Sequence, residues 1–309
     1  MSRPSVVITE PLNNDAVAWL AERCDVVFAN SDVSAELDEA LATAQGLVVR
    51  TYTRVDKSLL ARAPILRVVG RAGVGLDNID RDACAARNIA VVSTPDANTT
   101  AVVEYIWSLI FKVVRPVSPV TWALTSQEWR MVRDSTLASR ELSQMTLGVL
   151  GLGRIGSAVA RVGSTLMGRV IYHDLLDVPP DQRAGAEAVS RDELLAHSDI
   201  LTIHVDGRPT NRRLIGADEC ALLKPDVLFI NTSRGFVVDA GALATFLKTH
   251  ADARAILDVH DPEPFGADYP LFDLRNATLF PHIASATVHA KENMSWVVRD
   301  VWRELSSQQ

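Results

Sequence analysis

Short runs of β-branched residues alternate with amphipathic helical segments along nearly the whole chain. The runs fall into two sets, one between residues 5 and 93 and the other between residues 146 and 281. The first set is SVVIT, DVVFA, GLVVR, LRVVG and IAVVS, and the second is TLGVL, RVIYHD, SDILTIHV, DVLFINT, ARAILDV and ATLFP. Strands that alternate with helices form parallel sheets whose faces the helices cover. The sequence therefore predicts an α/β protein with two parallel sheets.

A long helical stretch separates the two sets of strands. The apolar residues of segment 98–114 wrap most of the way around a helix, which predicts burial on several sides. This helix either lies in the core between the sheets or contributes to a dimer interface, and Trp122 and Trp129 beyond it favour a homodimer. The last segment, 287–305, is predicted to be one amphipathic helix.

The composition limits the classes of function. Hydrophobic residues make up 48% of the chain and charged residues 22%, which is typical of a globular protein in water. The net charge of −7 offers no basic footprint for nucleic acid. Cys24, Cys84 and Cys220 form no CxxC pair, which excludes a zinc ribbon and favours a reducing compartment. No signal peptide, membrane span or appended regulatory domain is recognised. We therefore expect a cytoplasmic protein.

The stretch TLGVLGLGRIG carries glycines at G-x-G-x-x-G spacing between a predicted strand and a predicted helix. There Gly151 allows a tight turn, Gly153 lets the backbone approach a pyrophosphate, and Gly156 lets helix and strand pack closely. Amides at the helix N-terminus then face the phosphates. Asp174 ends the next strand, where an acid binds ribose hydroxyls and repels a 2′-phosphate, which favours NAD over NADP. The alternative is a glycine-rich turn that binds nothing.

Polar residues follow three strands of the second set, at the edge where open parallel sheets bind ligands. Arg234 follows VLFINTS, and its guanidinium can hold a carboxylate or a carbonyl oxygen. Asp258 and Glu263 lie in LDVHDPEPFG, and His282 follows ATLFP. The composition of LDVHDPEPFG alone leaves three interpretations open: a metal site, a solvated loop, or part of a catalytic centre.

Together these stretches resemble the D-isomer-specific 2-hydroxyacid dehydrogenase family, including its D-3-phosphoglycerate dehydrogenases, over almost the whole chain. GRAGVGLDNID resembles the family's substrate loop, NTTAVVE a helix start, and GLGRIG the cofactor loop, while NTSRG, DVHDPEP and PHIASAT match in order and spacing. The resemblance implies two Rossmann-like or flavodoxin-like domains with a cleft between them. We assign residues 1–96 and 286–309 to a substrate domain and residues 97–285 to an NAD-binding Rossmann domain.

The resemblance also implies a role for each matching residue. Arg234 would bind the substrate carboxylate and oxygen, His282 would be the acid/base, and Glu263 would orient the histidine. His260 and Asp261 are expected to face solvent. No second cluster of ligands supports a metal site, so no metal is expected. The implied cofactor contacts are Gly151, Gly153, Arg154, Ile155, Gly156, Asp174, His204, Thr232 and Asp258, the last near the nicotinamide. The implied substrate contacts are Arg50, Tyr52, the backbone amides of Gly73, Val74 and Gly75, Arg234 and His282.

The chemistry of 2-oxo acid reduction needs these types of residue. A hydride adds to the carbonyl carbon while a proton goes to the oxygen, and histidine gives and takes protons near neutral pH. An arginine stabilises the charge that develops on the oxygen. NAD supplies the hydride. The sequence therefore predicts an NAD-dependent oxidoreductase that interconverts a small 2-hydroxy acid and its 2-oxo acid.

The substrate itself is left open. Arg50, Arg54 and Arg71 could form a pocket for a second anionic group, as in 3-phosphoglycerate or sulfolactate, or they could be solvated or structural. Tyr52 is bulky where the phosphoglycerate enzymes tend to carry a small residue, which suggests a reshaped pocket. The physiological direction is equally open.

Three other functions remain as alternatives. They are a formate or phosphite dehydrogenase of the same family, an NAD(H)-sensing protein like the corepressors built on this fold, and a metal-dependent hydrolase. The chain also departs from the family pattern, with Asp206 in place of a proline, Arg208 and Asn211 in place of threonines, and Ala101 in place of a serine or threonine. These departures leave the details of nicotinamide binding open.

Overall fold

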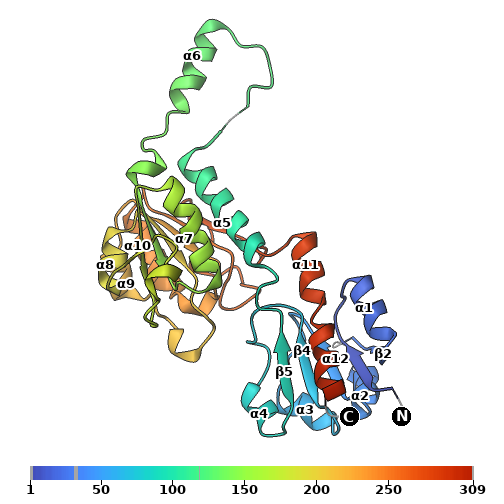
Figure 1. Ribbon diagram of the computed structural model, residues 1–309. Helices are drawn as coiled ribbons and strands as arrows, with labels where there is room; N and C mark the ends of the chain where they lie inside the picture. The colour runs from blue at the N-terminus through green and yellow to red at the C-terminus, as the bar shows by residue number, and fades with distance from the viewer. Residues whose placement is uncertain (1–2, 31–33, 118, 308–309) are drawn as a thin grey trace. The chain divides into compact units, whose positions relative to one another are not determined.

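The computed structural model describes residues 3–30, 34–117 and 119–307. The chain divides into two compact units, Met1–Asn98 with Ser285–Gln309, and Thr99–Ala284 (Figure 1). Each unit is built on its own parallel sheet, as the alternating pattern predicts. No helix in the described part of the chain is long and apolar enough to cross a membrane.

The first unit contains a five-stranded parallel sheet with the order β2-β1-β3-β4-β5, which is the flavodoxin-like order. Its strands are β1 (Ser5–Ile8), β2 (Asp25–Phe28), β3 (Gly46–Val49), β4 (Val68–Arg71) and β5 (Ala90–Ser93). Its helices are α1 (Asn14–Ala21), α2 (Ser34–Ala42), α3 (Lys57–Arg62), α4 (Arg81–Ala85), α11 (Val288–Ser295) and α12 (Val298–Ser307). Helix α12 packs on β3, β4 and β5.

The second unit contains a seven-stranded parallel sheet with the order β12-β11-β10-β9-β6-β7-β8. Its strands are β6 (Thr146–Leu150), β7 (Arg169–His173), β8 (Glu187–Ala188), β9 (Ile200–Ile203), β10 (Leu228–Asn231), β11 (Arg254–Leu257) and β12 (Ala277–Leu279). From β6, the chain first adds β7 and β8 on one side of the sheet and then β9 to β12 on the other. The strand order therefore reverses between β6 and β9, and doubly wound folds bind nucleotides at that point.

Helices cover both faces of the seven-stranded sheet. They are α5 (Thr99–Val114), α7 (Arg154–Leu166), α8 (Arg191–His197), α9 (Ala217–Leu222) and α10 (Ala240–Thr249). One apolar cluster joins α5 and α7 to the sheet, and a second joins α8, α9 and α10 to it (Figure 1). In β10, Phe229 belongs to one cluster and Ile230 to the other. Burial on both faces explains why these strands are continuously apolar.

The closing segment is not one helix, and this prediction was wrong. Helix α11 ends at Ser295 and α12 begins at Val298. The Ser295 hydroxyl donates to the carbonyl oxygen of Lys291 and accepts from the amide of Asn13. Such bonds from a side chain to the backbone compete with helical hydrogen bonding. The ring of Trp296 packs edge-on against Trp19, which holds the chain at the break.

Candidate active site

The glycine-rich loop between β6 and α7 has the geometry that a dinucleotide needs. Gly151 has a φ of +90°, and a Cβ there would lie 2.9 Å from the carbonyl carbon of His204. A Cβ on Gly156 would lie 2.0 Å from the carbonyl oxygen of Gly151. A Cβ on Gly153, in contrast, would meet no atom within 4 Å, so this position faces open space. The loop is therefore closely packed at Gly151 and Gly156 and open at Gly153, as pyrophosphate binding requires.

Asp174 follows β7 and folds back onto the glycine loop. Its Oδ2 atom accepts a hydrogen bond of 2.7 Å from the Leu152 amide, and Oδ1 accepts one of 2.9 Å from the Leu176 amide. A cavity of about 330 Å³ lies beside it, lined by residues 172–177 with Ala188 and Val189. A carboxylate beside an open cavity suits the adenosine part of NAD, and its charge disfavours a 2′-phosphate.

Further polar groups lie at the carboxyl ends of neighbouring strands. The hydroxyl oxygen of Thr232, after β10, is buried and has no hydrogen-bond partner among the described residues. Burial lowers the pKa of His204, after β9, to about 3, so its ring is neutral, and it lies 2.9 Å from the Thr202 hydroxyl. Arg154 and Ile155 begin α7. The buried Thr232 hydroxyl, the neutral His204 ring and the N-terminus of α7 are suited to binding NAD at the carboxyl ends of these strands.

His282 and Glu263 are hydrogen bonded to each other. The Nδ1 atom of His282 lies 2.9 Å from Oε2 of Glu263, and the backbone amide of His260 donates to Oε1 at 2.7 Å. Burial by itself raises the pKa of Glu263, but these hydrogen bonds outweigh it, and the pKa lies below the ordinary value. Glu263 is therefore a carboxylate that holds one ring nitrogen of His282.

Asp258 holds the backbone on which His282 lies. The carbonyl oxygen of Asp258 accepts from the His282 amide at 2.8 Å. Its carboxylate accepts from the amides of Ile283 at 2.9 Å and Ala284 at 2.8 Å, and from the Tyr105 hydroxyl at 3.2 Å. Burial raises the pKa of Asp258 in spite of these bonds. The side chain is 0% exposed, so Asp258 acts here as an internal anchor.

The prediction that His260 faces solvent was wrong. The residue is 6% exposed, and its Nε2 atom lies 2.8 Å from the carbonyl oxygen of Phe280. Its ring thus joins the β11 loop to the β12 loop, while its amide binds Glu263. The prediction failed because the ring satisfies its polar atoms inside the fold. Asp261 is exposed, as predicted.

Arg234 lies in the loop after β10. Its backbone oxygen accepts from the Asn231 amide group at 3.0 Å, and its Nη1 donates to the Ser233 carbonyl at 2.7 Å. A Cβ on Gly235 would lie 1.9 Å from the carbonyl carbon of His260. This close approach puts the Arg234 loop against the segment that leads to Glu263. The structure thus brings the loops of the three predicted catalytic residues together.

Three of the residues that depart from the family pattern, Asp206, Arg208 and Asn211, form a cluster after β9, whereas Ala101 lies in α5. Arg208 donates to the Asp206 carboxylate at 2.7 and 2.6 Å, and the Asn211 amide donates to it at 3.0 Å. Hydrogen bonds from Arg208, opposed by burial, lower the pKa of Asp206, and the charge of Arg234 adds to them. The negative charge of Asp206 is therefore largely balanced by Arg208.

In the first unit, Glu10 holds the loop that carries Arg50 and Tyr52. Its carboxylate accepts hydrogen bonds from the backbone amides of residues 50–53 at 2.8 to 3.2 Å. Burial raises the pKa of Glu10, but the four amides outweigh it, and the pKa is lowered. The Tyr52 side chain is 85% exposed at the tip of this loop. The predicted substrate residues Arg50 and Tyr52 thus lie on a firmly held turn.

Gly73 begins the other predicted substrate loop. Its φ is +149°, and a Cβ there would lie 1.4 Å from Nη1 of Arg71, so the guanidinium lies against the glycine. The Gly73 amide donates to the Arg71 carbonyl at 2.8 Å and is therefore already used within the loop. Val74 and Gly75 are partly exposed. Gly73 is buried, so Val74 and Gly75 are the two of the three predicted residues that reach the surface.

In addition to misplacing His260, sequence reasoning missed two residues, Tyr105 and Glu10. Tyr105 lies in an apolar helix and reads as a core aromatic, although a buried tyrosine hydroxyl needs a partner and so signals a polar neighbour. Glu10 follows a buried strand by two positions, and only the fold shows that it binds a distant loop. Among the described residues, no group of three His, Cys, Asp or Glu could hold a metal ion.

Comparison with known proteins identifies the family of this chain. A family model described as D-isomer specific 2-hydroxyacid dehydrogenase, NAD binding domain, matches residues 107–284. The (S)-sulfolactate dehydrogenase of Chromohalobacter salexigens is 39% identical, with 96% of each chain covered. The glyoxylate reductase of Aeropyrum pernix is 35% identical over 97% of this chain and 92% of its own. The D-3-phosphoglycerate dehydrogenase of Mycobacterium leprae is 35% identical, and the match spans 94% of this chain but 55% of that protein.

Solved structures agree with these relatives. The TT0316 protein from Thermus thermophilus has a TM-score of 0.81 and 31% identity, covering 98% of this chain and 97% of its own. The D-lactate dehydrogenase of Aquifex aeolicus, solved with NAD and lactic acid, has a TM-score of 0.79 and 26% identity, covering 98% and 95%. With a glycine loop open to a dinucleotide and a Glu263–His282 pair on the neighbouring loops, the chain belongs to the D-isomer-specific 2-hydroxyacid dehydrogenase family of NAD-dependent oxidoreductases.

Proposed function

We propose that the protein interconverts a small 2-hydroxy acid and its 2-oxo acid, with His282 as the proton carrier. The observation that carries the proposal is the 2.9 Å hydrogen bond between His282 Nδ1 and Glu263 Oε2. Because Glu263 occupies Nδ1, the other ring nitrogen, Nε2, is the one left to exchange a proton with the substrate. The His282 side chain is 45% exposed, so a ligand can reach it.

The chain's own residues perform the remaining steps. Bound nicotinamide supplies or accepts the hydride. In the reductive direction, protonated His282 gives its Nε2 proton to the carbonyl oxygen as the hydride reaches the carbon, which yields the hydroxyl. Glu263 stabilises the imidazolium before the transfer and holds the neutral ring after it. Arg234 binds the substrate carboxylate and offsets the charge that develops on the oxygen. Oxidation reverses each step.

We further propose that the substrate carries a second anionic group. One relative, 39% identical to this chain, is named a sulfolactate dehydrogenase, and another is named a phosphoglycerate dehydrogenase. In this chain Glu10 holds the Arg50 loop, and the guanidinium of Arg71 lies against Gly73 in the other substrate loop. Arginines on fixed loops suit a sulfonate or phosphate, because the guanidinium binds such groups bidentately.

A panel of acids tests the substrate class. Initial rates are followed by NADH absorbance with 3-sulfolactate, 3-phosphoglycerate, lactate and glycerate, with the matching 2-oxo acids, and with glyoxylate. We expect kcat/KM at least tenfold higher for an acid with a second anion than for lactate. The Arg71→Met variant should reduce that preference while leaving the rate with glyoxylate unchanged. Glyoxylate as the best substrate would contradict the second-anion proposal.

The same panel separates the other functions. Formate and phosphite are included, since oxidation of either would place the protein with those members of the family. A binding protein of the corepressor type predicts NADH binding without turnover of any acid. A hydrolase would lose activity with a chelator, whereas the proposed reaction is insensitive to one.

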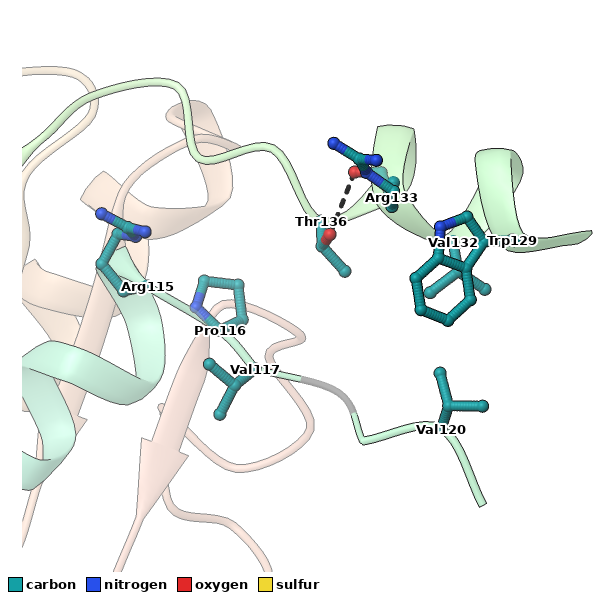
Figure 2. Close-up of a pocket in the computed structure, with 8 residues that line it drawn as sticks. All are labelled: Arg115, Pro116, Val117, Val120, Trp129, Val132, Arg133 and Thr136. Carbon is teal, nitrogen blue, oxygen red and sulfur yellow. Dashed lines mark hydrogen bonds between the residues drawn. The ribbon is translucent and has the colours of Figure 1, made fainter. Parts of the chain in front are cut away.

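We also propose a homodimer formed through the second unit. Helix α6 (Ser126–Ser135) has no buried residue and stands away from the sheet of its unit (Figure 1). Trp122 and Trp129 are 65% and 53% exposed. A pocket of about 350 Å³ opens between residues 115–117 and Val120 on one side and residues of α6 on the other, with the ring of Trp129 beside it (Figure 2). Apolar surface of this kind is typical of a protein interface.

Light scattering after size-exclusion chromatography checks the dimer. Wild type should elute as a dimer and Trp129→Asp as a monomer, and a monomeric wild type would overturn the proposal.

Binding to nucleic acid is not expected at a net charge of −7. A cytoplasmic location stays a prediction from the sequence.

A further inference from the structure

Tyr105 is a tyrosine on the mostly apolar helix α5, and its hydroxyl binds Asp258. It lies in α5 and donates to Oδ1 of Asp258 at 3.2 Å. Its ring packs edge-on against Phe280, with 5.8 Å between the ring centroids. Tyr105 therefore contacts both the residue that anchors the His282 loop and the residue at the start of that loop.

Asp258, the residue that Tyr105 binds, accepts hydrogen bonds from three consecutive backbone amides. Asp258 accepts from His282 through its backbone oxygen and from Ile283 and Ala284 through its carboxylate. His282 itself has a φ of +56°, a conformation that residues other than glycine rarely adopt. Such a backbone persists only where its surroundings determine it firmly. The Asp258 hydrogen bonds supply that determination.

We infer that Tyr105 is a positioning residue for the reaction, which acts through Asp258 to hold His282 in its catalytic place. It touches neither substrate nor the reacting atoms in this role. The inference rests on the proposed function of His282 as the proton carrier. It adds a residue on α5 that none of the sequence motifs identifies.

The physical basis is the charge of Asp258. The groups that bind its carboxylate are the Tyr105 hydroxyl from α5 and two backbone amides from the loop after β12, and the charge of His282 acts on it from the same loop. Burial raises the pKa of Asp258, while the Tyr105 hydrogen bond opposes that rise. Without the hydroxyl, the carboxyl group takes up a proton at a higher pH. A protonated carboxyl group is a weaker acceptor, so the amides of the His282 loop lose part of their support.

The test compares Tyr105→Phe with Trp107→Phe in the full-length protein. Tyr105→Phe keeps the ring that packs on Phe280 and removes only the hydroxyl. Trp107 is a buried neighbour on the same helix whose indole nitrogen has no hydrogen-bond partner in the described residues, so Trp107→Phe controls for altered packing of α5. The measurements are kcat with the best acid of the panel, the Kd of NADH from fluorescence, and kcat/KM against pH.

For Tyr105→Phe we expect kcat to fall about tenfold, which corresponds to about 1.4 kcal/mol. The acid limb of kcat/KM should move to higher pH, and the Kd of NADH should stay the same. Trp107→Phe should keep the wild-type kcat and acid limb, even if its melting temperature falls. An unchanged kcat and acid limb in Tyr105→Phe, or equal changes in both variants, would overturn the inference.

His282→Asn separates this inference from the proposed function. If His282→Asn turns over like wild type, the proposed role of His282 fails, and the inference fails with it. If His282→Asn is inactive and Tyr105→Phe is normal, the inference alone fails.

Discussion

The Nδ1 atom of His282 and the Oε2 atom of Glu263 lie 2.9 Å apart, although nineteen positions separate the two residues in the chain. Three contacts make this possible. The Asp258 carbonyl binds the His282 amide, the His260 amide binds Glu263, and the His260 ring binds the carbonyl oxygen of Phe280. The pair is thus built from the ends of β11 and β12, two neighbouring parallel strands.

Replacement of Arg234 by lysine should lower kcat/KM about 100-fold, because an ammonium group cannot hold a carboxylate bidentately. The loss should be seen with every 2-hydroxy and 2-oxo acid in the panel, since each carries the carboxylate. Arg212→Lys, at an exposed ion pair with Asp261, is the matched control and should keep the wild-type rate. A fall of less than threefold for Arg234→Lys would argue against a role in substrate binding.

Replacement of Asp174 by serine should lower kcat/KM for NADH about tenfold or more and raise the ratio of NADPH to NADH activity. The physical reason is the loss of charged acceptors for the ribose hydroxyls and of the repulsion toward a 2′-phosphate. Asp177→Asn removes a charge from the lining of the same cavity and serves as the control. Equal rates with NADPH and NADH in the wild type would refute the assignment of Asp174.

Replacement of Glu10 by glutamine should lower the free energy of unfolding by about 1–3 kcal/mol at pH 7, because an amide nitrogen would face backbone donors. The folded-state pKa of Glu10 lies below its ordinary value of 4.5, so its contribution is fully present above that value. As pH falls through the lowered pKa, the difference between wild type and variant should shrink. Urea unfolding at several pH values measures it. Glu22→Gln, at an exposed side chain, is the control, and a difference independent of pH would contradict the account.

The fold could be read from the chain because its signals are local. Apolar runs such as that of β10 between turn residues indicate buried parallel strands, and the glycine loop follows from a spacing whose physical reasons are known. The predicted strands and the long helix α5 are all present. The two-residue strand β8 was not predicted, because so short a run carries no periodic signal.

The details of the site could not be read in the same way, because they depend on distant partners. His260 is a polar residue, yet it is buried, with its ring hydrogen bonded to the carbonyl oxygen of Phe280. The Gly73 amide is hydrogen bonded to the carbonyl oxygen of Arg71, two residues earlier. The break between α11 and α12 depends on Asn13, far away in the chain. Periodicity describes which face of an element is apolar, but it does not show which polar atoms meet.

The most direct test of the central claim is the turnover of His282→Ala together with its binding of NADH. Turnover with the best acid of the panel should fall by a factor of about 10² to 10⁴, the usual contribution of a general acid or base. The Kd of NADH, from fluorescence titration, should match that of wild type, because the glycine loop and Asp174 are untouched. Wild-type turnover in His282→Ala would contradict the account.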